Sequence, residues 1–180
     1  MDDLYLKSAY YTQYAYDHNV DLGTTEYNVM NFEGYQFLSI PGTNEFKDWF
    51  KNANLWSKKG IKKSAYDAAI EIDKVFKRSN KLLVVTGHSK GAAEAVAYTK
   101  LFGAYRCIIF NPARCLRYWS DRNMDNTTMF IDPDDPVSKV GLISFGLPKC
   151  KIIKAKDDHF LPSVKDHFMD NWISYIKDMH

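Results

Sequence analysis

The sequence reads Lys81-Leu82-Leu83-Val84-Val85-Thr86-Gly87-His88-Ser89-Lys90-Gly91-Ala92-Ala93-Glu94-Ala95 near the middle of the chain, and this stretch decides the fold. The apolar run from Leu82 to Val85 is bounded by a lysine and a Thr-Gly pair, which predicts a short strand buried on both faces. The residues after Gly91 are small and favour helix, so we expect a strand, a sharp turn and a helix. Ser89 lies at the turn.

The spacing Gly87-x-Ser89-x-Gly91 has a mechanical reason. A strand that reverses directly into a helix leaves no room for Cβ atoms two residues on either side of the apex. The serine hydroxyl then lies near the start of the helix, where backbone N–H groups without intrahelical partners stabilise developing negative charge. The pattern indicates a nucleophilic serine, and the alternative is a glycine-rich turn with a structural role only.

Composition narrows the class of protein. A chain of 180 residues predicts a single domain, 1–180, with its own hydrophobic core, and a net charge of +2 gives no reason to expect a nucleic-acid partner. Cys107, Cys115 and Cys150 lack the spacing of a zinc site, so we expect free thiols, no metal and no cofactor. Without a signal-peptide pattern or a long apolar run, the expected location is cytoplasmic.

Strand and helix patterns alternate along the chain, which predicts an α/β fold with a mostly parallel central sheet flanked by helices. A polar loop is expected over residues 52–60, and the first helix is expected to cover a sheet edge. The expected strands span residues 27–32, 35–40, 82–85, 105–110, 129–131 and 150–155, and the expected helices span residues 4–18, 61–78, 92–102 and 164–179.

The exit of the strand 35–40 has the chemistry of an anion site. It runs into Pro41-Gly42-Thr43-Asn44, which offers a backbone N–H and a hydroxyl to an oxyanion at the edge of the sheet. The next segment places Phe46, Trp49 and Phe50 on one helical face. That face is either part of the core or a small hinged lid over an apolar site.

An acidic cluster, Asp132 to Asp135, follows the expected strand 129–131. It fits a calcium site, a turn or the acid of a catalytic triad. The prolines within and after it stiffen the chain and oppose wrapping around a metal, so we favour the triad acid.

A serine nucleophile needs a base, and histidine is the natural choice at neutral pH. His159 and His167 both follow the acidic cluster, in the order serine, acid, histidine that α/β-hydrolases use. We favour His167, because it precedes an apolar helix that can anchor it, and keep His159 as the alternative. His88 is expected to have a packing or turn role.

Several separated segments together resemble the class 3 lipase family. The matching motifs are Pro41-Gly42-Thr43-Asn44-Glu45-Phe46-Lys47-Asp48-Trp49, Val85-Thr86-Gly87-His88-Ser89, Phe110-Asn111-Pro112-Ala113-Arg114 and Asp135-Pro136-Val137. The resemblance covers roughly residues 25 to 140 and implies an α/β-hydrolase fold.

This resemblance implies a serine carboxylic-ester hydrolase that acts on a small-molecule ester or a lipid, with at most transient contact with a lipid surface. Ser89 would be the nucleophile, Asp135 the acid, Thr43 with the backbone N–H of Lys90 the oxyanion hole, and 46–50 the lid. An acyltransferase or thioesterase with the same triad stays open, as does a hydrolase-like binding module without catalysis.

Three residues depart from the family pattern, and one of them is Ala92, which stands where the family has a second glycine. Pro41 stands where the family usually has arginine, and Lys90 stands where it has leucine or glutamine. The segment 49–61 is also short for the family, which implies a small lid. Lys90 places a cation next to the nucleophile, and two interpretations stay open: a preference for anionic substrates, or a side chain directed to water.

Overall fold

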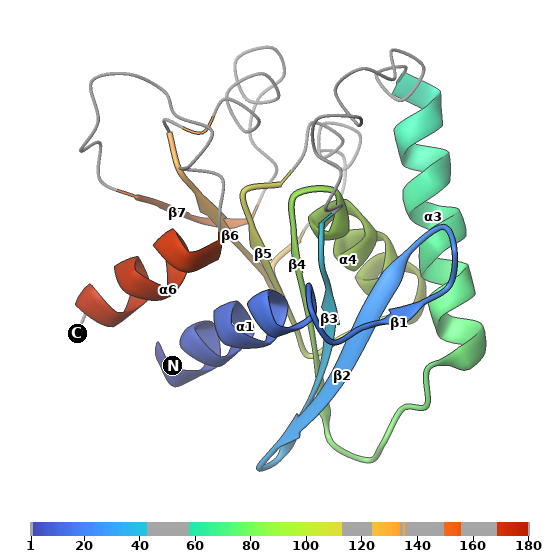
Figure 1. Cartoon of the computed structure of the whole chain (residues 1–180), viewed down its shortest axis with the longest axis horizontal. Coiled ribbons are helices and arrows are strands. Elements are labelled where there is room, and N and C mark those ends of the chain that lie inside the picture. Colours follow the sequence, from blue (N-terminus) through green and yellow to red (C-terminus); the bar gives the residue numbers. More distant parts are fainter. Residues whose placement is uncertain are drawn as a thin grey trace.

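The strands lie in the sheet in the order in which they occur along the chain (Figure 1). The computed structural model describes residues 2–42, 58–112, 124–133, 135, 150–155 and 169–179. Within these ranges, seven strands form the sheet: β1 (Val20–Asp21), β2 (Glu26–Phe32), β3 (Tyr35–Ile40), β4 (Leu82–His88), β5 (Arg106–Phe110), β6 (Thr127–Ile131) and β7 (Lys151–Lys154). The same ranges contain four helices: α1 (Asp2–Tyr14), α3 (Lys58–Val75), α4 (Ser89–Phe102) and α6 (Met169–Asp178).

Parallel pairing dominates the sheet, as predicted. The strands β3 to β7 pair in parallel, whereas β1 with β2 and β2 with β3 pair antiparallel. The predicted hairpin is confirmed: Phe32 pairs with Tyr35 across the Glu33-Gly34 turn, and Glu33 has a left-handed φ of 51°. Because the five parallel strands end on the same edge, loops that follow them gather there.

Helices cover both faces of the sheet (Figure 1). The helix α3 joins β3 to β4 and α4 joins β4 to β5, and each connection advances by one strand in the same direction. Right-handed crossovers therefore put α3 and α4 on one face. The helices α1 and α6 lie on the other face, so the expectation that the first helix covers an edge is wrong. Its Tyr5 and Ala9 pack on side chains of the central strands.

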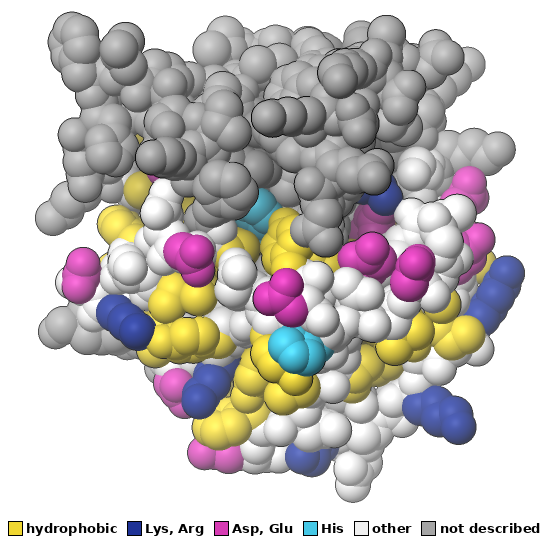
Figure 2. Space-filling view, in the orientation of Figure 1, with side chains coloured by type: hydrophobic (Ala, Val, Ile, Leu, Met, Phe, Trp, Pro, Cys, Tyr) yellow, Lys and Arg dark blue, Asp and Glu magenta, His cyan; other side chains and the backbone are white. Residues whose placement is uncertain are grey.

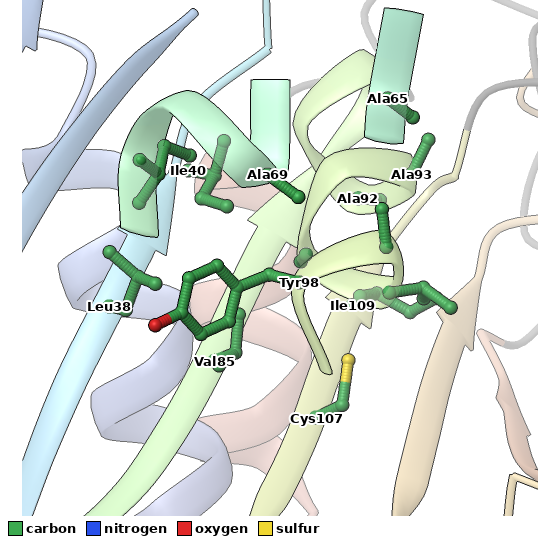
Figure 3. Packing of buried hydrophobic residues seen from close by; sticks show 14 of the residues in the cluster. Leu38, Ile40, Ala65, Ala69, Val85, Ala92, Ala93, Tyr98, Cys107 and Ile109 are labelled. Atoms are coloured by element: carbon green, nitrogen blue, oxygen red, sulfur yellow. The ribbon is translucent and has the colours of Figure 1, made fainter. Parts of the chain in front are cut away.

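Alternation along the strands divides the core in two. Leu38 and Val85 face α3 and α4, whereas their neighbours Phe37 and Val84 face α1 and α6. The first core uses small side chains where the helices approach the sheet, among them the alanines of Figure 3. These are Ala65, Ala69, Ala92 and Ala93. The second core is aromatic and includes Phe37, Phe110, Phe130 and Trp172.

Several element boundaries differ from the predictions. The helix α1 ends at Tyr14, four residues before His18, and α3 occupies 58–75 instead of 61–78, so 58–60 are helical rather than loop. The strand β4 continues past Val85 to His88, because backbone pairing with β3 and β5 extends to that point. The two-residue strand β1 was not predicted, since it is too short to show a pattern. Predicted residues 52–57 and 164–168 lie outside the described ranges.

The visible face of the described region mixes acidic, basic and apolar side chains (Figure 2). Among the described helices, none combines the length and the apolarity needed to cross a membrane. Cys107 and Cys150 are free thiols, and Cys115 lies outside the described residues.

Candidate active site

Ser89 lies at the junction between strand and helix. It is the first residue of α4, it directly follows the end of β4, and its φ is 53°. A non-glycine residue in this left-handed region carries about 1–2 kcal/mol of backbone strain. The side chain is buried, with 4% exposed. The N–H groups of the first turn of α4, including that of Lys90, have no acceptor within the helix.

The two glycines that flank Ser89 are required by contacts with backbone. A Cβ at Gly87 would lie 2.4 Å from the carbonyl oxygen of Gly91. A Cβ at Gly91 would lie 2.2 Å from the carbonyl oxygen of Pro41 and 2.3 Å from that of Ile40. The steric reason predicted for the motif therefore holds at Gly87, whereas at Gly91 the obstacle is the end of β3.

Gly42 brings the segment after β3 against Ser89. A Cβ at Gly42 would lie 3.0 Å from the Cβ of Ser89 and 3.3 Å from the carbonyl oxygen of His88. The next residue, Thr43, lies outside the described residues, as do the lid candidates Phe46, Trp49 and Phe50. The residue just before Thr43 in the chain therefore lies beside Ser89.

Tyr16 links both sides of the elbow, and sequence reasoning missed it. Its hydroxyl accepts a hydrogen bond from the Gly42 N–H at 2.9 Å and lies 2.5 Å from Nδ1 of His88. Burial raises the pKa of Tyr16 far above its usual value, so the hydroxyl keeps its proton. His88 is buried and engaged here, in agreement with its expected packing role. No local pattern sets Tyr16 apart among the tyrosines of this region.

Asp135 lies beyond the end of β6 and is fully buried. The segment that leads to it is held by Asn111, which follows β5. The Asn111 side-chain oxygen accepts from the Asp132 N–H at 2.9 Å, and the Asn111 N–H donates to the Phe130 carbonyl oxygen at 2.9 Å. Asn111 is itself buried with a φ of 38°. Ser89 and Asp135 therefore follow the carboxyl ends of β4 and β6, two strands of the same parallel set.

The candidate bases His159 and His167 lie outside the described residues. The chain on either side of them is described. On one side is Ala155, directly after β7, whose N–H donates to the Ile131 carbonyl oxygen at 3.0 Å. On the other side is Met169, where α6 begins. Because β7 runs parallel to β6, Ala155 lies at the same edge of the sheet as Asp135.

The Lys90 cation is engaged within the protein. Its Nζ donates to the Thr24 carbonyl oxygen at 3.0 Å and lies 3.1 Å from Oε1 of Glu94. The side chain is 30% exposed, and Glu94 is 2% exposed. The cation thus points to a buried carboxylate and the β1–β2 turn, an arrangement that the sequence did not predict.

No metal site accompanies these groups in the part of the chain that is described. Across those ranges, histidine, cysteine and acidic side chains form no cluster of three or more that could hold a metal ion. The described part of the site presents a strained hydroxyl, backbone N–H donors and a buried carboxylate.

Comparison with known proteins places the fold. No protein-family model matches the chain, and no curated protein matches it. The structure is similar to the triacylglyceride lipase of Rhizomucor miehei, with a TM-score of 0.54 and 12% identity over 89% of this chain and 91% of that one. It is similar to Lip2 lipase from Yarrowia lipolytica, with a TM-score of 0.54 and 13% identity over 86% and 78% of the two chains.

A mutant form of MDLA from Penicillium cyclopium is a third similar structure, with a TM-score of 0.50 and 22% identity over 83% of this chain and 67% of that one. At these identities the likeness is one of fold. The chain has an α/β-hydrolase fold of the kind found in lipases, and that prediction is confirmed.

Proposed function

We propose that the protein is a serine carboxylic-ester hydrolase that acts on small-molecule esters or lipids through an acyl-enzyme. One observation carries the proposal: Ser89 has a φ of 53° at the start of α4, and Gly42 lies so close to it that an added Cβ would be 3.0 Å from the Ser89 Cβ. This geometry presents a hydroxyl between a helix N-terminus and the segment that leads to Thr43. The hydrolase fold and the lipases that share it support the same reaction class.

In the proposed mechanism, Ser89 Oγ attacks the ester carbonyl carbon while His167 takes the hydroxyl proton. Asp135 orients the imidazole and stabilises its charged form; His159 is the alternative base. The carbonyl oxygen becomes an oxyanion, which accepts hydrogen bonds from the Lys90 N–H and from Thr43. The C–O bond to the alcohol then breaks, and the imidazolium returns the proton to the departing alcohol.

The acyl group, now on Ser89, is released by water. The histidine takes a proton from a water molecule as its oxygen attacks the acyl carbon, and the same oxyanion donors act again. Collapse releases the carboxylic acid, and the proton returns to Ser89. Each oxyanion donor typically contributes about 3 kcal/mol in the transition state, so Thr43→Ala should lower kcat by about 100-fold with little effect on KM.

The test combines a fluorophosphonate probe with p-nitrophenyl esters of short and medium acyl chains. The wild type should be labelled and should release p-nitrophenol, and Ser89→Ala should do neither. Ser79→Ala is the matched control, because Ser79 is exposed and lies outside the site. His167→Ala should lose activity while His159→Ala keeps it. An active, labelled Ser89→Ala variant would exclude this mechanism.

Further measurements separate the related activities. An acyltransferase would transfer the acyl group to an added alcohol faster than to water. A thioesterase would hydrolyse acyl thioesters faster than the matching oxygen esters. A protein without catalytic function would bind esters without labelling at Ser89. We expect hydrolysis of oxygen esters to dominate.

A further inference from the structure

The side-chain ammonium group of Lys90 is held by two contacts with other residues of the fold. Its Nζ donates to the Thr24 carbonyl oxygen at 3.0 Å and pairs with Oε1 of Glu94 at 3.1 Å. Thr24 lies in the turn between β1 and β2, and Glu94 lies one turn further along α4. The backbone of Lys90, meanwhile, belongs to the first turn of α4, directly after Ser89.

Glu94 makes this arrangement unusual, because it is a buried carboxylate in the core next to the elbow. It is 2% exposed, and its other oxygen accepts a hydrogen bond from the Thr25 hydroxyl at 2.5 Å. Burial is the main cause that raises the pKa of Glu94, the charge of Glu26 on β2 adds to it, and Lys90 and Thr25 oppose it. Burying such a group is costly unless its partners are held in place.

Together, Lys90, Glu94, Thr24 and Thr25 form what we call the Lys90 clamp. It ties the β1–β2 turn to the first turn of α4. The turn is also closed on itself, by the Leu22 N–H donating to the Thr25 carbonyl oxygen at 2.9 Å, so it is a firm anchor. On its outer side, the Thr24 hydroxyl donates to Glu71 of α3.

We propose that Lys90 and Glu94 are positioning residues that hold the backbone N–H of Lys90 in the oxyanion hole. The first turn of a helix lacks the hydrogen bonds that restrain later turns, so its N–H groups need another restraint. The clamp supplies one through the side chain of the residue whose N–H is used. This inference rests on the proposed function, and its signature is a change in kcat rather than in KM, because oxyanion contacts form in the transition state.

The experiment compares Lys90→Met, Glu94→Gln and the double variant with the wild type, using kcat and KM for a p-nitrophenyl ester and the rate of fluorophosphonate labelling. A small displacement of a catalytic donor costs up to about 100-fold, so we expect each single variant to lose about tenfold in kcat with KM changed by less than about twofold. The double variant should lose little more than either single variant, because both break the same clamp. Lys90→Arg should recover part of the rate.

Glu71→Gln is the matched control, because it removes the charge of another carboxylate that contacts the same turn, by the same isosteric change, at a position outside α4. It should leave kcat within about twofold of the wild type, even if the unfolding midpoint falls. Lys74→Met controls for the loss of one exposed lysine. If Lys90→Met does not fold, Glu94→Gln, which keeps the shape of the side chain, carries the comparison.

Three results would overturn the inference. One is a kcat within about twofold of the wild type for both Lys90→Met and Glu94→Gln. Another is an equal loss of kcat in Glu71→Gln and Glu94→Gln, which would make the effect one of turn stability. A wild type that neither hydrolyses esters nor reacts with the probe would refute the proposed function, and this positioning role with it.

Discussion

Gly91→Ala tests the packing that brings the end of β3 against the start of α4. A Cβ at this position would lie 2.2 Å from the Pro41 carbonyl oxygen and 2.3 Å from that of Ile40, whereas ordinary contact begins at 3.4 Å. Both obstacles are backbone atoms, so no side chain can rotate away. The helix and the end of the strand must therefore separate by about 1 Å.

The separation has two costs. Overpacking of this kind destabilises a protein by about 2 kcal/mol, which lowers the Tm of a chain of 180 residues by roughly 4–8 °C. It also moves Gly42 away from Ser89, and a misplacement of about 1 Å at a catalytic site costs about 100-fold in rate. Without the clash, Gly91→Ala would stabilise the protein, because alanine is more favourable than glycine in a helix by about 1 kcal/mol.

The assay pairs urea unfolding with the rate of fluorophosphonate labelling, and Gly34→Ala is the control. Gly34 lies in the β2–β3 turn, where an added Cβ meets nothing within 4 Å. Both substitutions lower the conformational entropy of the unfolded chain, which adds about 0.4–1 kcal/mol to the free energy of unfolding in each case. The difference between the two variants in this free energy therefore reports the clash. A Gly91→Ala variant as stable and as reactive as Gly34→Ala would refute the close approach of β3 and α4.

Four further predictions follow from three single groups. Ser89→Gly should be more stable than Ser89→Ala by about 1 kcal/mol in urea unfolding, because glycine adopts a φ of 53° without strain, while both variants are inactive. Tyr16→Phe should lower kcat by about tenfold and destabilise by about 1–3 kcal/mol, because Gly42 N–H and His88 Nδ1 lose a buried partner. Burial raises the pKa of Cys107 to about 12, so at pH 8 its thiol should resist iodoacetamide in the native state and react in urea. For the same reason, the free energy of unfolding should fall as pH rises from about 9 towards 12, because the unfolded thiol ionises first.

Each of these has a clear contrary outcome. Equal stability of the two Ser89 variants would mean that the left-handed backbone carries no strain. A Tyr16→Phe variant with wild-type kcat and stability would show that the Tyr16 hydroxyl holds nothing in place. Native labelling of Cys107 as fast as labelling in urea, mapped by mass spectrometry, would contradict its burial.

Much of the fold was predictable because its signals are local. The apolar run Leu82 to Val85 predicts a strand, and the residues around Glu33-Gly34 predict a hairpin. The alanine-rich segment after Gly91 predicts a helix. Boundaries were less predictable. The strand β4 extends to His88 because β3 and β5 lie beside it, and nothing in the local sequence records those neighbours.

For the candidate site, the sequence by itself determined the elbow, since the Gly-x-Ser-x-Gly pattern and the flanking strand and helix signals are local. A Cβ at Gly87 would meet Gly91, only four residues along the chain, whereas the obstacles at Gly91 are Ile40 and Pro41, which only the tertiary structure brings there. It also placed Asp135 after a strand that ends at the same edge. Only the tertiary structure decided what surrounds Ser89. The hydroxyl of Tyr16 reaches Gly42 and His88 because α1 packs on a face of the sheet instead of along its edge. In the same way, the Lys90 cation is paired with Glu94 and Thr24 because the β1–β2 turn folds back on α4. Such contacts join residues far apart in the chain, so they depend on how the elements pack and have no trace in the local pattern of residues.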